Sequence, residues 1–259
     1  MTFVGSSTAA MGASIIGRPE ARSIHSDGQH PARVLAVAVH PGDCFFSMGA
    51  PVALAVQQHG MGQFLSLSLG SRGSASVPPD VYGAMQKSAS ERGSEILGAE
   101  KPVLMAYEDG EVPSNDEIRF AVCDVIRKFM PTVVITHWKG SWHKDHRACH
   151  EIVNDAIFYA GLPAIKRDNP AHTVKKVFYA WNWEDAGGFT ADVYLDISPV
   201  FEQWKAACAC FPMWRGENGF RYDNYYQSNA VETGCICGAP YGVALMSPRE
   251  QLVQYLKWL

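Results

Sequence analysis

Two short clusters of histidine and aspartate contain the residue types that bind metal ions. His40 and Asp43 stand three positions apart, and His143, Asp145 and His146 form a second cluster later in the chain. Together, His40, Asp43 and His146 offer two imidazoles and one carboxylate, a ligand set that leaves the fourth position of a tetrahedral zinc ion open for water. Such a zinc ion lowers the pKa of its water toward neutrality and polarises a carbonyl group. We therefore predict one zinc ion as the cofactor of a hydrolytic site.

His143 and Asp145 are the expected catalytic pair of this site. Asp145 is adjacent to the histidines of its cluster, and its carboxylate is expected to orient His143 through a ring N–H. His143 is then free to act as an acid or as a hydrogen-bond donor, and His150 is a candidate for a supporting contact with His146. The alternative is a solvated helix face, because His143, His146 and His150 follow helical spacing and nine histidines produce some clusters by chance.

The clusters follow two segments that have the pattern of buried strands. Residues 33–39 and 132–136 are short apolar runs rich in valine, which is typical of strands in a parallel sheet covered on both faces. The first run ends at His40, and helical periodicity begins near Asp145 after the second. Ligands of open α/β sheets bind beyond the carboxyl ends of the strands. Both clusters are therefore expected at the same edge of one sheet.

The remaining pattern alternates strands and helices. We expect further strands at 63–69, 102–107, 175–181 and 191–197, and helices at 47–60, 81–97, 115–130 and 199–211. This alternation predicts an α/β fold with a doubly wound, mostly parallel sheet and helices on both faces. The last 45 residues, rich in glycine, aromatic and polar residues, have the composition of a long loop that lines a site or a subunit contact. We therefore also expect a homo-oligomer.

The composition limits the class of protein and of partner. The chain has 259 residues, 47% hydrophobic and 19% charged, which fits a single metal-binding α/β domain over 31–259 after a flexible segment at 1–30. A net charge of −4 without a basic run argues against nucleic acid, and the lack of about 18 consecutive apolar residues argues against a membrane-spanning helix. The expected partner is a small molecule. Seven dispersed cysteines, an odd number, indicate reduced thiols and a cytoplasmic protein.

The two clusters also resemble a known pair of sequence signatures. HPGDC at 40–44 and HKDHRACH at 143–150 are similar to the His-Pro-Asp-Asp-Glu and His-Pro-Asp-His-x-x-x-His signatures of the PIG-L/LmbE-like family of zinc-dependent de-N-acetylases. The order of elements agrees from about residue 33 to 205. The resemblance implies a Rossmann-like fold, a zinc ion held by His40, Asp43 and His146, and a catalytic pair at Asp145 and His143. The chain is thereby identified as a divergent member of this family.

Gly42 is the main departure from the family pattern. In the family's deacetylases an aspartate at this position is the general base that activates the zinc-bound water, and glycine transfers no proton. The base then has to come from elsewhere, and His143, His172 and Glu184 are the candidates. Cys44 replaces a common glutamate. We expect it to be a packed thiol, because a lone cysteine beside a helix start is more often packed than a nucleophile or a ligand.

Three functions fit this pattern. The predicted one is metal-dependent hydrolysis of an amide or N-acetyl bond in a small, sugar-like substrate. The second is water addition to an unsaturated carboxylate, as in the zinc-dependent 4-oxalomesaconate hydratases, and the third is binding without turnover. A dicarboxylate substrate requires fixed cations, whereas an amino sugar is favoured by aromatic platforms. Loops on the expected site face offer both kinds of side chain: Arg72, Lys139, Lys144, Trp138, Trp142, Trp181 and Trp183. We predict Arg72, Trp142 and Lys144 as substrate contacts.

Overall fold

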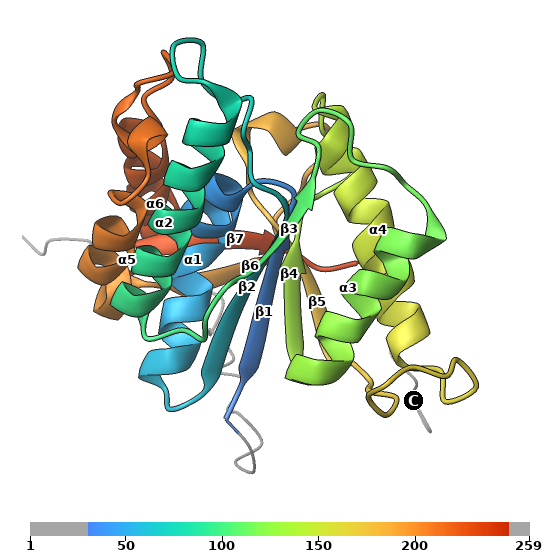
Figure 1. The fold of residues 1–259 in the computed structure, drawn as a ribbon. Helices are drawn as coiled ribbons and strands as arrows, with labels where there is room; N and C mark the ends of the chain where they lie inside the picture. The colour runs from blue at the N-terminus through green and yellow to red at the C-terminus, as the bar shows by residue number, and fades with distance from the viewer. Residues whose placement is uncertain (1–30, 249–259) are drawn as a thin grey trace, which may run out of the picture. The chain divides into compact units, whose positions relative to one another are not determined.

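The strands of the protein form one mixed sheet in the computed structural model, which describes residues 31–248 (Figure 1). The seven strands lie in the order β3-β2-β1-β4-β5-β7-β6. Their bounds are β1 Arg33–Ala38, β2 Met61–Ser68, β3 Val103–Tyr107, β4 Val133–Thr136, β5 Lys176–Ala180, β6 Val193–Asp196 and β7 Gly242–Met246. The strands β1 to β5 pair in parallel, whereas β7 runs antiparallel to β5 and β6. The predicted flexible segment at 1–30 lies outside the described residues. The last part of the predicted 31–259 domain, from residue 249 onward, also lies outside them.

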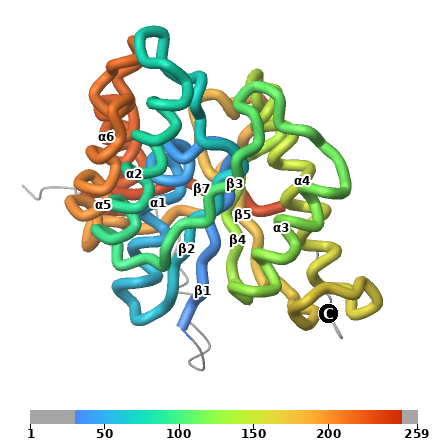
Figure 2. Tube along the Cα trace, viewed as in Figure 1, coloured from blue at the N-terminus to red at the C-terminus, as the bar shows by residue number. Residues whose placement is uncertain are grey.

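Helices cover both faces of this sheet. Within residues 31–248 the α-helices are α1 Pro41–Gln57, α2 Pro79–Leu97, α3 Asp116–Phe129, α4 Lys144–Ala160, α5 Phe201–Cys208 and α6 Tyr222–Cys237. Four of them, α1, α2, α5 and α6, lie on one face, and α3 and α4 lie on the other (Figures 1 and 2). The arrangement confirms the predicted doubly wound, mostly parallel α/β fold.

The central strand β1 is buried on both sides. Ala36 and Ala38 belong to the core that contains α1, whereas Leu35 and Val37 pack with α3 and α4. Burial on both sides explains why the apolar run is continuous instead of alternating. Because β1 pairs with both β2 and β4, the ends of β1 and β4 lie next to each other.

The helix α1 begins earlier than the sequence pattern indicated. It was expected from Ser47, but it starts at Pro41, and Pro51 lies inside it. Proline is favourable at the first position of a helix, because the N–H that it lacks would have no partner there. His40 is therefore the N-cap residue and Asp43 lies in the first turn. This short connection places both residues at the carboxyl end of β1.

The C-terminal part of the described chain is not a long loop, so that prediction is wrong. It contains α6 and the strand β7, which adds to the sheet. The buried residues of α6 include Tyr222, Tyr226, Ala230 and Thr233, which recur at helical spacing. Because these residues are partly polar, a hydrophobicity pattern does not reveal their period.

Arg127 joins α3 to the C-terminal end of α4. The residue is 3% exposed. Its guanidinium donates hydrogen bonds to the backbone carbonyls of Tyr159, Ala160, Leu162, Ile165 and Asn169. The last carbonyls of a helix have no partner within the helix, and Arg127 donates to two of them, those of Tyr159 and Ala160. It thereby fixes the helix whose other end carries the second histidine cluster.

We expect Arg127→Met to destabilise the fold strongly. The methionine keeps part of the side-chain volume but removes the five hydrogen bonds that the guanidinium donates, at a cost of about 3–5 kcal/mol in the free energy of unfolding. Urea denaturation followed by circular dichroism measures the change. The control is Lys128→Met, an exposed position on the same helix, which should change stability by less than about 0.5 kcal/mol. Equal unfolding midpoints for the two variants would contradict the prediction.

All seven cysteines are free thiols, and four of them are buried: Cys44, Cys123, Cys149 and Cys208. Buried thiols of this kind pack as small apolar side chains. No helix in residues 31–248 combines the length and the apolar character needed to cross a membrane.

Candidate metal centre

The two histidine clusters meet at the carboxyl edge of the sheet. His40 follows β1 and caps α1, while His143 caps α4, the helix that follows β4. The ring centroids of His40 and His143 are 5.0 Å apart, and those of His40 and His146 are 5.4 Å apart. The neighbouring strands β1 and β4 thus bring together residues that are far apart in the sequence.

Three side chains converge as the ligands of a metal site do. His40, Asp43 and His146 each offer one ligand atom, and these atoms all lie within 4.8 Å of one another. The Oδ2 atom of Asp43 is 3.0 Å from His40 Nδ1 and 3.3 Å from His146 Nε2. His146 is fully buried, yet its Nε2 has no hydrogen-bond partner among the described residues. A buried polar atom that makes no hydrogen bond is rare, and this nitrogen is therefore available to bind a metal ion.

The surroundings of His146 favour a positive charge. Burial lowers the pKa of His146, but the charge of Asp43 and the hydrogen bond to Asp185 outweigh burial and raise the pKa to about 10. The carboxylates that favour a protonated His146 would also stabilise a divalent cation at this position. Two imidazoles and one carboxylate are donors that zinc accepts. The unpartnered Nε2 and the donor set therefore fit a metal ion.

Two carboxylates that were not predicted from the sequence hold these histidines. Asp185 accepts hydrogen bonds from Nδ1 of His146 at 2.7 Å and from Nδ1 of His137 at 2.8 Å. Asp109 accepts one from Nε2 of His40 at 3.0 Å. Each imidazole of the candidate ligand set therefore has a carboxylate on its outer nitrogen, which fixes the tautomer and the ring orientation. Both aspartates follow a strand of the sheet, β3 or β5, and this position was the signal available in the sequence.

His143 is oriented by the backbone, and not by the carboxylate of Asp145 as expected. Its Nδ1 accepts a hydrogen bond from the backbone N–H of Asp145 at 3.2 Å, because His143 is the N-cap residue of α4. The carboxylate of Asp145 instead accepts the backbone N–H of Gly110 at 2.7 Å. The proton of the neutral ring therefore sits on Nε2. Burial and the nearby His146 and His40 lower the pKa of His143 to about 4, so the ring is neutral near pH 7.

Glu184, a candidate base from the sequence, lies at the cluster. Its Oε2 is 3.2 Å from His146 Nε2, and burial together with the charge of Asp43 raises its pKa to about 7. His172, another candidate from the sequence, hydrogen-bonds the carbonyl of Pro131, which precedes β4. That position is at the opposite end of the sheet from the cluster. His172 is therefore excluded as the base, and Glu184 and His143 remain.

The loop that carries Glu184 is bonded to the loop that precedes α4. The backbone N–H of Trp142 donates to the carbonyl of Glu184 at 3.2 Å, and that of Gly187 donates to the carbonyl of Gly140 at 2.9 Å. The two backbones are so close that a Cβ on Gly140 would overlap the carbonyl oxygen of Gly187. Only glycine fits at position 140, and the position of Glu184 depends on this contact.

Comparison with known protein families finds a match over the residues that form this cluster. The family model described as "PIG-L: GlcNAc-PI de-N-acetylase" matches residues 35–157, which contain both histidine clusters. Residues 35–157, a little less than half of the chain, therefore resemble the PIG-L family. A diacetylchitobiose deacetylase of Thermococcus kodakarensis is 26% identical to it over 182 residues, which are 66% of this chain and 65% of that relative. The match thus spans a little less than two thirds of the curated relative.

Solved structures similar to this protein include a deacetylase and a hydratase. The conserved protein TT1542 of Thermus thermophilus has a TM-score of 0.74 and 24% identity, covering 88% of this chain and 99% of that chain. The N,N'-diacetylchitobiose deacetylase of Pyrococcus horikoshii has a TM-score of 0.72 and 19% identity, covering 86% and 89%. The 4-carboxy-2-hydroxymuconate hydratase of Pseudomonas putida has a TM-score of 0.75 and 20% identity, covering 87% and 99%. These similarities establish the shared fold, which serves both reactions.

The space beside Gly42 is filled by neighbouring side chains. A Cβ on Gly42 would lie 3.1 Å from both Met213 Sδ and Phe46 Cε2. Met213 therefore occupies part of the space that the family's aspartate would need. Cys44 supplies no substitute, because its buried thiol donates to the Leu65 carbonyl at 3.3 Å and burial raises its pKa well above the ordinary value. Cys44 is a packed thiol, as its sequence context predicted.

The cluster opens into a cavity of about 440 Å³. Arg72, a predicted substrate contact, lines this cavity, but its guanidinium donates to the carbonyl of Asp109 and pairs with Glu108 and Glu111. Lys144 was predicted with it, but it is exposed in the first turn of α4 and is not among the described residues that line the cavity. The carboxylates that line the cavity are those of Asp43, Asp109 and Glu184. Arg72 is the one lysine or arginine among the described lining residues of this cavity, and it is already paired with carboxylates.

An aromatic wall stands at the mouth of the cavity. Trp142, the third predicted substrate contact, lines the cavity and is 63% exposed. Its ring centroid is 5.7 Å from that of Trp183, which stacks on Phe220 at 4.4 Å. The rings of Trp142, Trp183 and Phe220 form this aromatic wall. It offers apolar ring surface beside the polar cluster.

Four other residues considered from the sequence lie away from this cavity. Trp138, Lys139 and His150 line a separate cavity, and Trp181 lines a third. The Nδ1 of His150 donates to the backbone carbonyl of His137 at 2.9 Å. His150 thus reaches the cluster through His137, where a contact with His146 was expected.

Proposed function

We propose that the protein is a metal-dependent de-N-acetylase that hydrolyses the N-acetyl bond of a small, sugar-like substrate. The observation that carries this proposal is the convergence of His40, Asp43 and His146 beside a cavity that the Glu184 carboxylate and the neutral His143 ring also line. The match to the PIG-L family and the diacetylchitobiose deacetylase relative support the same reaction. We also propose a small molecule as the partner and a cytoplasmic setting, and the free thiols are consistent with that setting.

The metal would be held by His40, Asp43 and His146, and zinc is the proposed ion. When bound, the metal acidifies a water molecule and polarises the carbonyl of the substrate. Asp109 and Asp185 hold the outer nitrogens of the two imidazoles, so the ligand nitrogens point to one place before anything binds.

Glu184 acts as the general base in place of the residue missing at position 42. Its Oε2 lies 3.2 Å from His146 Nε2, within reach of a water molecule held at the cluster. The carboxylate accepts a proton from water as the water oxygen attacks the carbonyl carbon. It returns this proton to the nitrogen as the C–N bond breaks, and acetate and the free amine leave.

His143 stabilises the negative charge that develops on the carbonyl oxygen. The backbone N–H of Asp145 occupies Nδ1, so the ring donates from Nε2. A neutral donor of fixed orientation suits this role, since it needs no reorganisation as the charge forms. Because the pKa of His143 is lowered to about 4, we assign proton delivery to Glu184 and not to His143.

The lack of an unpaired lysine or arginine in the described lining of the cavity favours an uncharged amide over a dicarboxylate. The hydratase alternative needs fixed cations, but Arg72 is already paired with Glu108 and Glu111, and carboxylates line the same cavity. An acetylated sugar brings no charge and presents C–H faces that pack against the aromatic wall. The hydratase reaction is therefore the second candidate, with the absence of an aspartate at Gly42 as its main support, and binding without turnover is the third.

Release of acetate from N-acetylglucosamine and N,N'-diacetylchitobiose by the zinc-loaded protein tests the proposal. We expect acetate in equal amount to newly formed primary amine, and loss of the activity on chelation. Hydration of an unsaturated dicarboxylate, followed by the fall in its ultraviolet absorbance, with no acetate from either sugar would replace the proposal by the hydratase alternative.

The aromatic wall makes a prediction for substrate binding. We expect Trp142→Ala to raise KM by about tenfold and to change kcat less than twofold, since stacking stabilises bound substrate and transition state alike. Steady-state acetate release measures both constants. Trp142→Phe is the control that keeps an aromatic face and should recover most of the affinity. A fall in kcat with an unchanged KM would place Trp142 in the chemical step instead.

A further inference from the structure

Asn182 contacts two parts of the site at once, and the proposed reaction steps do not involve it. It follows β5 and is only 1% exposed. Its Nδ2 donates to Asp43 Oδ1 at 2.8 Å, and its Oδ1 accepts the backbone N–H of Glu184 at 3.0 Å. One buried amide therefore joins a proposed metal ligand to the residue that we assign as the general base.

The two partners fix the orientation of this amide. A backbone N–H only donates, so the atom that faces Glu184 is the oxygen of the amide. An ionised carboxylate only accepts, so the atom that faces Asp43 is the nitrogen. An aspartate at position 182 would have no donor for Asp43, and a serine would have no second polar atom. Asparagine meets both requirements with one short side chain.

The bond from Asn182 gives the two oxygens of Asp43 different roles. Oδ2 lies 3.0 Å from His40 Nδ1 and 3.3 Å from His146 Nε2, whereas Oδ1 is bonded to Asn182. A carboxylate that is free to rotate presents either oxygen to its neighbours. The bond to Oδ1 therefore keeps Oδ2 directed at the two imidazoles.

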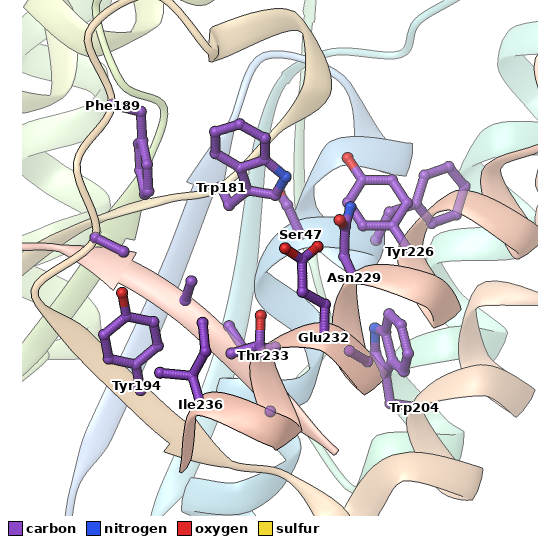
Figure 3. Close-up of a pocket in the computed structure, with 16 residues that line it drawn as sticks. Ser47, Trp181, Phe189, Tyr194, Trp204, Tyr226, Asn229, Glu232, Thr233 and Ile236 are labelled. Atoms are coloured by element: carbon purple, nitrogen blue, oxygen red, sulfur yellow. The ribbon is translucent and has the colours of Figure 1, made fainter. Parts of the chain in front are cut away.

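The direction of the Asn182 side chain is set together with that of Trp181. The backbone of Asn182 is extended, with φ −138° and ψ 139°, so successive side chains point to opposite sides. Trp181 lines a separate cavity (Figure 3), and its Nε1 donates to the Tyr225 hydroxyl at 2.9 Å. Because the indole is held on that side, the next side chain is directed at the metal cluster.

Asn182 also holds the short turn that carries Glu184. Residues Trp183–Asp185 form a 3₁₀ turn, and Asn182 is its N-cap residue. The side chain of Asn182 accepts the N–H of Glu184, and its backbone carbonyl accepts the N–H of Asp185 at 2.9 Å. Asp185 in turn holds the outer nitrogen of His146. The turn thus brings two carboxylates to the cluster, and Asn182 fixes where it begins.

Asn182 acts through these neighbours and not on the substrate. It is not among the described residues that line the metal cavity. Its nitrogen and its oxygen are both already bonded. Its contribution therefore concerns how Asp43 and Glu184 are placed.

We propose that Asn182 is a positioning residue that raises the metal affinity through Asp43 and holds Glu184 in place through the 3₁₀ turn. The inference rests on the proposed function, since it takes Asp43 as a metal ligand and Glu184 as the base. Loss of a residue that supports a metal ligand typically lowers metal affinity or activity by about 10–100-fold.

Asn182→Ser separates the two contacts. A serine hydroxyl still accepts the N–H two residues further on, but it is too short to reach Asp43. We expect the zinc affinity of the full-length protein, measured by competition with a chelator, to fall by about 10–100-fold. At saturating zinc, kcat for acetate release should stay close to the wild-type value.

Asn182→Ala removes both contacts. It should lower the zinc affinity as Asn182→Ser does, and it should in addition lower kcat at saturating zinc by about 10–100-fold, because Glu184 is no longer held in place. KM should be unchanged in both variants, since Asn182 does not line the cavity. Circular dichroism of the metal-free proteins checks that they are folded.

Cobalt(II) in place of zinc gives a readout that a purely structural role would not change. The visible absorption of protein-bound cobalt depends on the arrangement of its ligands, so Asn182→Ser should shift the spectrum. Should this variant not fold, Asn182→Asp replaces it, because aspartate keeps the shape of the side chain and the contact with Glu184. It also lacks the donor to Asp43 and should shift the cobalt spectrum.

The matched control is Asn154→Ser. The Nδ2 of Asn154 donates to the His150 carbonyl at 2.7 Å, and its Oδ1 accepts from the Tyr179 hydroxyl at 3.2 Å, so its amide also joins two segments. Neither partner is a proposed metal ligand. Asn154→Ser should therefore leave the zinc affinity, the cobalt spectrum and kcat unchanged.

Three results would overturn the role of Asn182 toward the metal: equal zinc affinities for the wild type and Asn182→Ser, an unchanged cobalt spectrum, and an equal loss of zinc affinity in Asn154→Ser. Equal kcat values for the serine and alanine variants at saturating zinc would refute its role toward Glu184. Zinc affinity and the cobalt spectrum are measured without substrate. A protein that shows both expected changes but releases no acetate would therefore refute the proposed function and not the contact with Asp43.

Discussion

Replacement of Glu184 by glutamine is expected to lower kcat for acetate release by about 10²–10⁴-fold, the usual contribution of a general base. Glutamine keeps the shape of the side chain but accepts no proton from water. The metal content should stay the same, because Glu184 is not among the three proposed ligands. Steady-state kinetics measure kcat, and metal analysis of the same preparation measures the metal content. The control is Glu95→Gln, an exposed carboxylate on α2.

A rescue experiment sharpens this prediction. Adding Gly42→Asp restores a carboxylate at the position where the family carries its base, and Met213→Ala opens the space that Met213 Sδ now occupies. In the Glu184→Gln background, this pair should recover part of kcat, whereas Gly42→Ala with Met213→Ala should not. A Glu184→Gln variant that keeps more than about a tenth of the kcat would show that another group is the base.

His146→Ala is expected to abolish both metal binding and activity. The substitution removes one of three proposed ligands and leaves the buried carboxylate of Asp185 without one of its two donors. We expect the zinc content to fall from about one per chain to less than about a tenth, as measured by elemental analysis after dialysis. Circular dichroism checks that the fold is retained.

His150→Ala is the matched control for His146→Ala. It lies one turn further along the same helix and bonds only a backbone carbonyl of the cluster. It should keep most of the zinc. Full zinc occupancy in His146→Ala would contradict the ligand set, and loss of zinc in both variants would point to the stability of α4 and not to ligation.

The parts of the fold that the sequence predicted well are those with local signals. The buried runs at β1 and β4 are apolar on both faces, and the histidine clusters directly follow them. Because ligand sites of open α/β sheets lie beyond the carboxyl ends of the strands, the proximity of the two clusters could be predicted. The start of α1 was predicted at Ser47 and not at Pro41, because Pro41 and Gly42 are residue types typical of a turn. The helix α6 was missed because its buried face carries tyrosine and threonine as well as apolar residues.

The supporting residues of the site depend on contacts between distant segments. Asp185 meets His146 across 39 positions and Asp109 meets His40 across 69, and no local pattern indicates either partner. The pairing of Arg72 with Glu108 and Glu111 is of the same kind. The residue types at the cluster could therefore be predicted, whereas their orientation and charge balance required the fold.

The backbone contact between the loop of Glu184 and the loop ahead of α4 separates two properties that evolution can change. Main-chain hydrogen bonds and the Gly140–Gly187 contact position Glu184, and they do not depend on the side chains of Trp142 and Trp183. These two tryptophans project from the same loops into the aromatic wall. Substitutions of Trp142 and Trp183 can therefore change which substrate is accepted while Glu184 keeps its position. The two loops therefore allow the side chains that contact the substrate to change while the position of Glu184 is kept.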